Sequence, residues 1–342
     1  MRYLFTTLAL LALLPGIAAF QDRQTPADVT LRGQRHEFTP TVFHNRLAAT
    51  TTPVIRVSPG DTLHTTTIDA AGTDEKGMRR AEAGNPLTGP FYINGAEPGD
   101  TVAILLTRLR LNRDWAISTD NLSDRATTPE LAARMKGQGQ LVRWRLDLQR
   151  GIATRENPSP SLARYEVPLK PMLGCIALAP PVADPVPHSG EFGVWGGNLD
   201  FNEIVEGTTV FLPVSVPGGL LFLGDAHAAQ GDGELNGNGL ETSMDVEIRV
   251  DLLPRHPIPA PRVESSTHLM TMGLGASLDD ALRKATTNMV DWLMARHALP
   301  LPEVSQVLGT SAEYRVSVVV GRNAGIVLKL HRDRLRSFKS GG

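Results

Sequence analysis

Cysteine is almost absent from the sequence. Cys175 is the only one, so no disulfide bond can form within the chain. Its apolar surroundings favour a buried structural thiol over a nucleophile. The sequence also has no Gly-x-Ser-x-Gly elbow, which argues against a serine hydrolase of that type. It has no P-loop and no dinucleotide-binding fingerprint, so we expect no nucleotide cofactor.

An excess of one charge sign is absent as well. Lysine and arginine together number 34, aspartate and glutamate 36, and the formal net charge is −2. This balance argues against a general nucleic-acid-binding surface. Beyond residue 20, no segment contains the roughly 20 consecutive apolar residues that a membrane-spanning helix needs. We therefore expect neither a nucleic-acid partner nor membrane association of the mature chain.

Residues 1–20 have the pattern of a secretory signal peptide. Arg2 supplies a positive charge, residues 4–17 are apolar, and small residues follow before a polar stretch. The alternative is an uncleaved N-terminal anchor, although the apolar run is shorter than a spanning helix requires. We expect cleavage near Ala19 or Phe20 and a periplasmic or secreted protein.

The distribution of glycine and proline predicts many short strands and turns. The chain has 32 glycines and 25 prolines. Segments rich in β-branched or alternating apolar residues lie at 54–57, 62–68, 101–106, 141–148 and 243–253. One long helix is predicted over residues 277–296, because Ser277 is a suitable N-cap and apolar residues follow at helical spacing. We predict a mainly β protein with a β-rich domain over 36–255 and an α+β portion over 256–342.

Acidic residues and one histidine are concentrated in the Gly-rich stretch 190–241. They are Asp200, Glu203, Asp225, His227, Asp232, Glu234 and Glu241. Carboxylate oxygen and imidazole nitrogen suit hard or borderline cations, and glycine lets the backbone approach a site closely. This stretch is therefore a candidate metal site.

Each motif in the stretch also has a purely structural interpretation. Asp225 and His227 lie two residues apart at the end of an apolar strand, so they can bind one cation together or form a hydrogen-bonded pair. Asp232 and Glu234 alternate with glycines, which leaves their carboxylates accessible, but Asp-Gly is also a common turn dipeptide. The spacing alone leaves both interpretations open.

Several blocks taken together resemble the acetamidase/formamidase family. The blocks are 85–90 (NPLTGP), 93–101 (INGAEPGDT), 171–176 (PMLGCI), 196–200 (GGNLD), 224–234 (GDAHAAQGDGE) and 268–273 (HLMTMG). The resemblance covers roughly residues 40–335. It implies a jelly-roll-like β-sandwich with an additional α+β C-terminal portion. It also implies a homo-oligomer that hydrolyses carbon–nitrogen bonds in linear amides such as formamide and acetamide (EC 3.5.1-like), releasing ammonia and a carboxylate.

The resemblance further implies roles for individual residues. Asp200, Asp225 and His227 are the expected metal ligands, Glu234 the general base, and Glu241 a further ligand or neighbouring acid. The expected cation is zinc, with calcium as the alternative. In this hypothesis a metal-activated water attacks the amide, and Glu234 passes the proton of that water to the leaving amine.

Three other positions bear on this hypothesis. Asp69 is a further catalytic candidate that would line the same cleft, and its alternative role is that of a turn-capping aspartate. Members of the family often carry histidine where this chain has Asn85 and Trp195. These departures motivate the alternative function of a catalytically inactive exported protein that binds a ligand or metal on the same fold. An enzyme requires four residues to converge in one cleft: Asp200, Asp225, His227 and Glu234.

Overall fold

The computed structural model describes residues 33–137, 139–182, 185–336 and 338, all of which belong to one compact unit. The predicted signal peptide over residues 1–20 lies outside the described residues. None of the helices in the described part of the chain is both long and apolar enough to cross a membrane.

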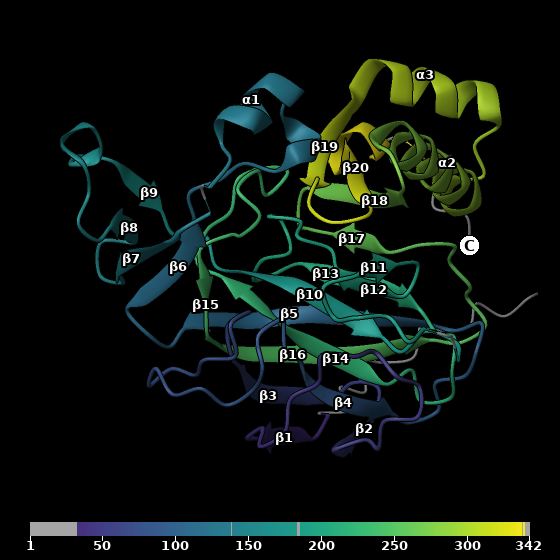
Figure 1. Cartoon of the computed structure of the whole chain (residues 1–342). Helices are drawn as coiled ribbons and strands as arrows, with labels where there is room; N and C mark the ends of the chain where they lie inside the picture. Colours follow the sequence, from purple (N-terminus) through teal and green to yellow (C-terminus); the bar gives the residue numbers. More distant parts are fainter. Residues whose placement is uncertain (1–32, 138, 183–184, 337, 339–342) are drawn as a thin grey trace, which may run out of the picture. The chain divides into compact units, whose positions relative to one another are not determined.

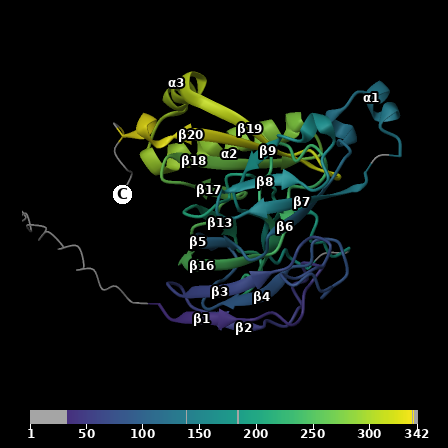
Figure 2. The same cartoon turned by 90° about the vertical axis from the view of Figure 1, so that its left-hand side faces the viewer.

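One sheet has nine strands and extends from the N-terminal to the C-terminal part of the described chain. Its spatial order is β1-β3-β16-β5-β13-β17-β18-β20-β19. Figure 2 shows these strands stacked from β1 at the bottom to β20 near the top. The bounds are β1 (Arg35–Phe38), β3 (Thr62–Thr67), β16 (Met244–Leu253), β5 (Thr101–Leu111), β13 (Thr209–Pro213), β17 (Arg262–Glu264), β18 (His268–Gly275), β20 (Ala324–His331) and β19 (Ala312–Val318).

The second sheet has eleven strands. Its main path is β11-β12-β10-β14-β15-β6-β7-β8-β9, and two further strands join it because β4 pairs with β14 and β2 pairs with β4. The bounds are β11 (Phe192–Gly193), β12 (Gly196–Asn198), β10 (Met172–Leu178), β14 (Leu221–His227), β15 (Glu241–Thr242), β6 (Trp115–Thr119), β7 (Leu141–Asp147), β8 (Ile152–Arg155), β9 (Glu166–Pro168), β4 (Thr88–Ile93) and β2 (Ile55–Val57).

The two sheets share one hydrophobic core. Leu63 and Ile248 of the nine-stranded sheet belong to the same buried cluster as Phe91, Ile176 and Leu223 of the eleven-stranded sheet. Apolar residues that alternate along a strand place one face of each sheet in this core. The mainly β class predicted from the sequence is confirmed, whereas the jelly-roll order of strands stays a prediction.

Helices are few and lie mainly near the C-terminal end of the described chain. They are α1 (Pro129–Arg134), α2 (Leu278–His297) and α3 (Leu301–Ser311), with short 3-10 turns η1 (Asp124–Ala126), η2 (Pro160–Leu162) and η3 (Arg332–Leu335). The Ser277 side chain accepts a hydrogen bond from the Asp280 amide, which confirms the predicted N-cap of α2. Figure 1 shows α2 and α3 beside β18–β20 at the top of the molecule.

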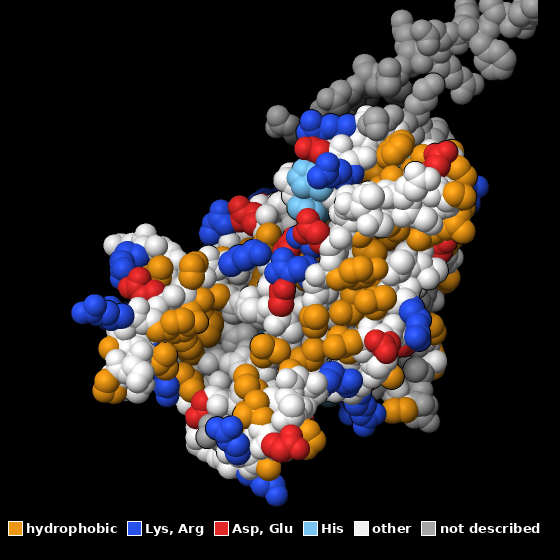
Figure 3. Space-filling view, turned by 90° about the horizontal axis from the view of Figure 1, so that it is seen from above, with side chains coloured by type: hydrophobic (Ala, Val, Ile, Leu, Met, Phe, Trp, Pro, Cys, Tyr) orange, Lys and Arg blue, Asp and Glu red, His pale blue; other side chains and the backbone are white. Residues whose placement is uncertain are grey.

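Strands on both sides of residue 255 contribute to the nine-stranded sheet, since β17 follows that residue and pairs with β13. The division into portions 36–255 and 256–342 stays a prediction. Seen from above, the surface is hollowed between the lobe of β7–β9 and the rest of the molecule (Figure 3). Acidic and basic side chains gather near the middle of the same face.

The contact between β18 and α2 depends on Gly273. A Cβ atom at this position would lie 1.8 Å from the Ala281 carbonyl oxygen and 2.4 Å from the Ala285 amide nitrogen. Both are backbone atoms, so Gly273→Ala forces the helix away from the sheet. We expect a loss of about 3 kcal/mol in the free energy of unfolding, measured by urea denaturation.

The matched control is Gly309→Ala in α3, where a Cβ atom meets nothing within 4 Å. That replacement should stabilise the protein by about 0.5–1 kcal/mol, because alanine favours a helix interior over glycine. Equal urea midpoints of unfolding for Gly273→Ala and Gly309→Ala would contradict the close packing of β18 against α2.

Candidate metal and catalytic site

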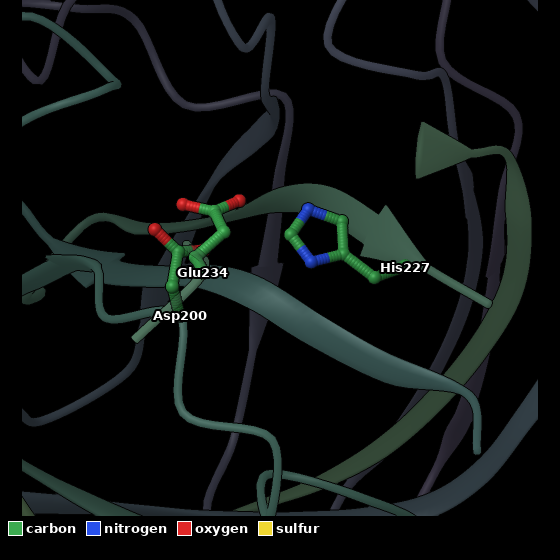
Figure 4. A group of neighbouring side chains, drawn as sticks. All are labelled: Asp200, His227 and Glu234. Carbon is green, nitrogen blue, oxygen red and sulfur yellow. The ribbon is translucent and has the colours of Figure 1, made fainter. Parts of the chain in front are cut away.

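Five buried titratable residues meet at the C-terminal end of β14. They are Asp200, Asp225, His227, Glu234 and Glu241, and each is at most 6% exposed. Potential ligand atoms lie within 4.8 Å of one another in two overlapping trios, Asp200–His227–Glu234 and Asp225–His227–Glu241. Figure 4 shows the carboxylates of Asp200 and Glu234 facing the ring of His227. His227 therefore lies at the centre of one continuous group.

Strand pairing brings most of this group together. Asp225 and His227 lie two residues apart on β14, so their side chains leave the same face of the sheet. Across the antiparallel pair β14–β15, Glu241 is the register partner of His227. His227 Nε2 lies 3.1 Å from Glu241 Oε1 and 3.4 Å from Asp225 Oδ1. This arrangement corresponds to the pairing of Asp225 and His227 anticipated from their spacing.

Two glycines leave the space that the group occupies. A Cβ atom on Gly174 of β10 would lie 2.5 Å from Asp200 Oδ1 and 2.6 Å from Asp225 Oδ2. A Cβ atom on Gly239 would lie 2.4 Å from His227 Nδ1. Any larger residue at either position would displace the site side chains. The glycines therefore set how closely the backbone can approach them.

The backbone of the site is conformationally unusual. Asp200, Asp225 and Glu234 have φ values of 42°, 57° and 50°, in the left-handed region that L-residues other than glycine rarely adopt. Each such conformation costs on the order of 1–3 kcal/mol and persists only where the surrounding structure fixes it. Three of the five site residues thus have backbone conformations that are intrinsically unfavourable for their residue types. Such conformations are typical of functional sites.

Gln230 orients His227 by accepting a hydrogen bond from its ring. The Gln230 Oε1 atom lies 2.7 Å from His227 Nδ1, and Gln230 Nε2 donates to the Asp200 carbonyl oxygen at 2.6 Å. Because an amide oxygen can only accept, His227 carries a proton on Nδ1. The lone pair of a neutral imidazole is then on Nε2, which faces the carboxylates and is the atom that a metal would use.

A second set of side-chain amides orients Asp200. Asn85 Nδ2 donates to Asn198 Oδ1 at 2.8 Å, and Asn198 Nδ2 donates to Asp200 Oδ2 at 2.6 Å. This leaves Asp200 Oδ1 to face the other acids. Asn85, the first of the two departures from the family pattern, therefore acts on the site through Asn198.

Four ligand-type atoms in the group make no well-aligned hydrogen bond among the described residues, although His227 Nε2 lies 3.1 Å from Glu241 Oε1 and 3.4 Å from Asp225 Oδ1. They are Asp200 Oδ1, Asp225 Oδ1, His227 Nε2 and Glu241 Oε2. Buried acceptors without donors are strongly unfavourable, and native proteins rarely contain them in clusters. A divalent cation bound by either trio would take up such atoms as ligands, and carboxylate oxygen with imidazole nitrogen is a suitable donor set. The residues present therefore fit a metal.

The electrostatics of the group agree with this fit. Burial raises the pKa of Glu234 to about 8, and the charges of Glu241 and Asp225 act in the same direction while His227 opposes them. Burial, followed by the neighbouring carboxylates, raises the pKa of Asp200 well above its ordinary value. Burial alone would lower the pKa of His227, but Glu241 and Asp225 outweigh it and raise that pKa well above its usual range. A positive charge keeps such acids ionised together, and either a protonated His227 or a bound cation supplies one.

The other predicted catalytic residue, Asp69, is not in either trio. Its Oδ1 accepts from the Thr73 amide at 2.8 Å, and its Oδ2 accepts from Arg113 Nη2 at 2.8 Å. These contacts are those of the turn-capping alternative, extended by a buried ion pair. Arg113 also donates to the Glu241 carbonyl oxygen at 3.1 Å, so Asp69 supports the backbone beside the site. A catalytic role for Asp69 stays a prediction.

Trp195 and Cys175 also lie outside the group. Trp195 lines a cavity of about 580 Å³ together with Met272 and residues of α2. Cys175 is fully buried, and burial raises the pKa of its thiol well above the ordinary value. This agrees with the structural interpretation of the single cysteine.

Sequence reasoning did not assign roles to Gly174, Asn198 and Gln230. All three lie inside the blocks that carry the family resemblance, so the blocks marked the right segments. What the segments could not reveal is that a glycine on β10 faces two aspartates. That contact depends on strand pairing, since β10 lies next to both β12 and β14.

Comparison with known proteins points to one family. The acetamidase/formamidase family model matches residues 186–295, which contain all five site residues. An acetamidase structure from Bacillus halodurans is 28% identical, with a TM-score of 0.75 over 87% of this chain and 97% of that one. An acetamidase structure from Yersinia enterocolitica is 27% identical, with a TM-score of 0.77 over 90% of this chain and 94% of that one.

The alignment with curated sequences is shorter. A candidate formamidase from Schizosaccharomyces pombe is 26% identical over 215 residues, which are 49% of this chain and 51% of that protein. The chain thus aligns with about half the length of this relative.

The role of Gly174 can be tested through cation binding. We expect Gly174→Ala to weaken the binding of Zn²⁺ by tenfold or more, because its Cβ atom would displace the carboxylates of Asp200 and Asp225. Competition with a chromophoric chelator measures the affinity. In the control Gly231→Ala a Cβ atom meets nothing within 4 Å, and its affinity should stay within about twofold of wild type. Equal affinities for the two variants would rule out this role for Gly174.

Proposed function

Because the chain belongs to the acetamidase/formamidase family, we propose that the protein hydrolyses the carbon–nitrogen bond of short linear amides, releasing ammonia and a carboxylate. The observation that carries this proposal is the convergence of the buried residues around His227. Four carboxylates in two overlapping trios share a single imidazole, which is a suitable arrangement for hydrolysis assisted by a cation.

Asp200, Asp225 and His227 are the proposed cation ligands, with Glu241 as a further ligand. Each of these four contributes an atom without a well-aligned hydrogen bond in the described part of the chain. Zinc is the proposed ion and calcium the alternative. When bound, such a cation would supply Lewis-acid polarisation of the amide carbonyl and of a water molecule.

Glu234 is the proposed general base. Its carboxylate faces the cluster from the loop that follows β14, and the side chain is almost completely buried. A carboxylate in this position can accept a proton from the attacking water and pass it to the leaving nitrogen. Gln230 holds His227 with a proton already on Nδ1. That nitrogen therefore cannot accept the proton of the attacking water.

The alternative of an inactive binding protein rested on Asn85 and Trp195. Convergence of the four predicted residues favours the enzyme, because a scattered arrangement was the expectation for the alternative. Asn85 also has a specific contact that orients Asp200 through Asn198. Trp195 lines the cavity beside α2.

Export is a further part of the proposal. Residues 1–20 carry the signal-peptide pattern, and we propose a periplasmic or secreted location for the mature protein. We also propose a homo-oligomer, because the family resemblance implies one; light scattering of the purified protein measures its mass.

The Glu234→Gln variant tests the amidase mechanism. We expect kcat for acetamide or formamide to fall by about 10²–10⁴-fold, because glutamine cannot accept the proton. Ammonia release from formamide, acetamide and propionamide is measured after chelation and again after addition of Zn²⁺ or Ca²⁺. The control is Glu191→Gln, an exposed acid within the matched segment, which should retain wild-type rates. No ammonia from any of the three amides with the wild-type protein would refute the proposed activity, and full activity of Asp225→Ala/His227→Ala without metal would refute the cation mechanism.

The Leu10→Arg variant tests export. A charge in the apolar region should block translocation, so the full-length chain should accumulate in the cytoplasm. Cell fractionation locates the protein, and N-terminal sequencing of the wild type should give a mature end near Ala19 or Phe20. A wild-type protein that stays in the cytoplasm with residues 1–20 intact would disprove export.

A further inference from the structure

The loop that carries Glu234 is fastened to the C-terminal hairpin β19–β20. The Gly233 amide donates to the Val316 carbonyl oxygen at 2.9 Å, and the Val319 amide donates to the Gly233 carbonyl oxygen at 3.0 Å. Gly233 and Val318 thereby form an isolated parallel bridge. Both backbone polar groups of the residue before Glu234 are thus fixed by β19 and the residue that follows it.

A side-chain contact reinforces this attachment one residue earlier. Arg315 of β19 donates to both carboxylate oxygens of Asp232, from Nε at 2.5 Å and from Nη2 at 2.6 Å. Its Nη1 donates to Glu203 at 3.1 Å, and Lys329 of β20 donates to the same Glu203 oxygen at 2.6 Å. A bidentate guanidinium–carboxylate pair fixes orientation as well as distance. Residues 232 and 233 are therefore both held by the hairpin.

This attachment matters because the conformation of Glu234 is unfavourable by itself. The residue has a φ of 50°, and glutamate has no local side-chain contact that favours the left-handed region. Such a conformation persists only where neighbouring contacts over-determine it. If residues 232 and 233 were released, the loop could relax and the Glu234 carboxylate would leave its position beside Asp200 and His227.

We propose that the β19–β20 hairpin positions Glu234, and that Arg315 is the residue that does so. Arg315 acts through Asp232, which it binds together with Glu203, while the backbone of Gly233 is bonded to Val316 and Val319. It also lies beyond residues 186–295, the part of the chain that the family model matches. The consequence for catalysis rests on the proposed amidase function, whereas the consequence for the loop does not.

The test compares Arg315→Ala with a matched variant, Arg296→Ala. Both arginines form ion pairs, and their side chains are similarly exposed, 35% for Arg315 and 37% for Arg296. Arg296 pairs with Glu264, which belongs to neither trio. We expect Arg315→Ala to lower kcat by about tenfold or more with KM within about threefold, because the base is misplaced while amide binding is retained. Arg296→Ala should leave both values within twofold.

Two further variants separate positioning from general destabilisation. Arg315→Lys keeps the charge but loses the bidentate geometry, so its kcat should lie between those of wild type and Arg315→Ala. Asp232→Asn should lower kcat, and adding Arg315→Ala to it should lower kcat little further, because the two residues act as one pair. A kcat for Arg315→Ala within twofold of wild type, or an equal loss in Arg296→Ala, would overturn the proposal.

Amide hydrogen exchange tests the loop without reference to activity. In Arg315→Ala the amides of Gly233 and Val319 should exchange at least tenfold faster than in wild type, and in Arg296→Ala they should not. If wild type hydrolyses no amide, the proposed function fails. The exchange rates still test whether Arg315 holds the loop of Glu234 on the hairpin. If wild type is active and exchange is unchanged in Arg315→Ala, the positioning role fails while the proposed function stands.

Discussion

The structure around the site depends on one constraint, which is that four carboxylates must stay close together, out of water, around a single imidazole. Buried acids lose hydration and repel one another, and the few amide donors near them satisfy only part of their oxygens. The fold therefore fixes each side chain from outside the group. Gly174 leaves space for two of the aspartates, the β14–β15 pairing sets Glu241 opposite His227, and β19 anchors the residues that precede Glu234.

The two sheets support this arrangement because they share a common core. Site residues lie at strand ends and in loops between strands, where side chains can leave the core and face one another. Asp200 and Glu234 lie in loops between strands, so contacts with neighbouring elements hold their left-handed backbone.

Local patterns in the sequence predicted much of the fold and part of the site. Alternating apolar residues located β16 (Met244–Leu253), and the N-cap Ser277 located α2, because both patterns arise within one element. The spacing of Asp225 and His227 likewise placed two site residues on one strand face. Contacts between distant segments were beyond local patterns. Asp69 had the signature of a turn, but its buried partner Arg113 lies 44 residues away, and nothing in the alternation of either segment specifies that pairing.

The bridge between Gly233 and β19 has a consequence for the order in which the protein matures. Arg315 follows Asp232 by 83 residues, and a nascent chain leaves the ribosome with its N-terminal part first. All five residues of the site are therefore synthesised before the hairpin that anchors one of them. During this interval the chain already contains every acid and the histidine, yet the loop of Glu234 has no partner strand. Every residue of the site therefore precedes the strand that holds Gly233, and the loop of Glu234 gains its partner strand only when β19 docks.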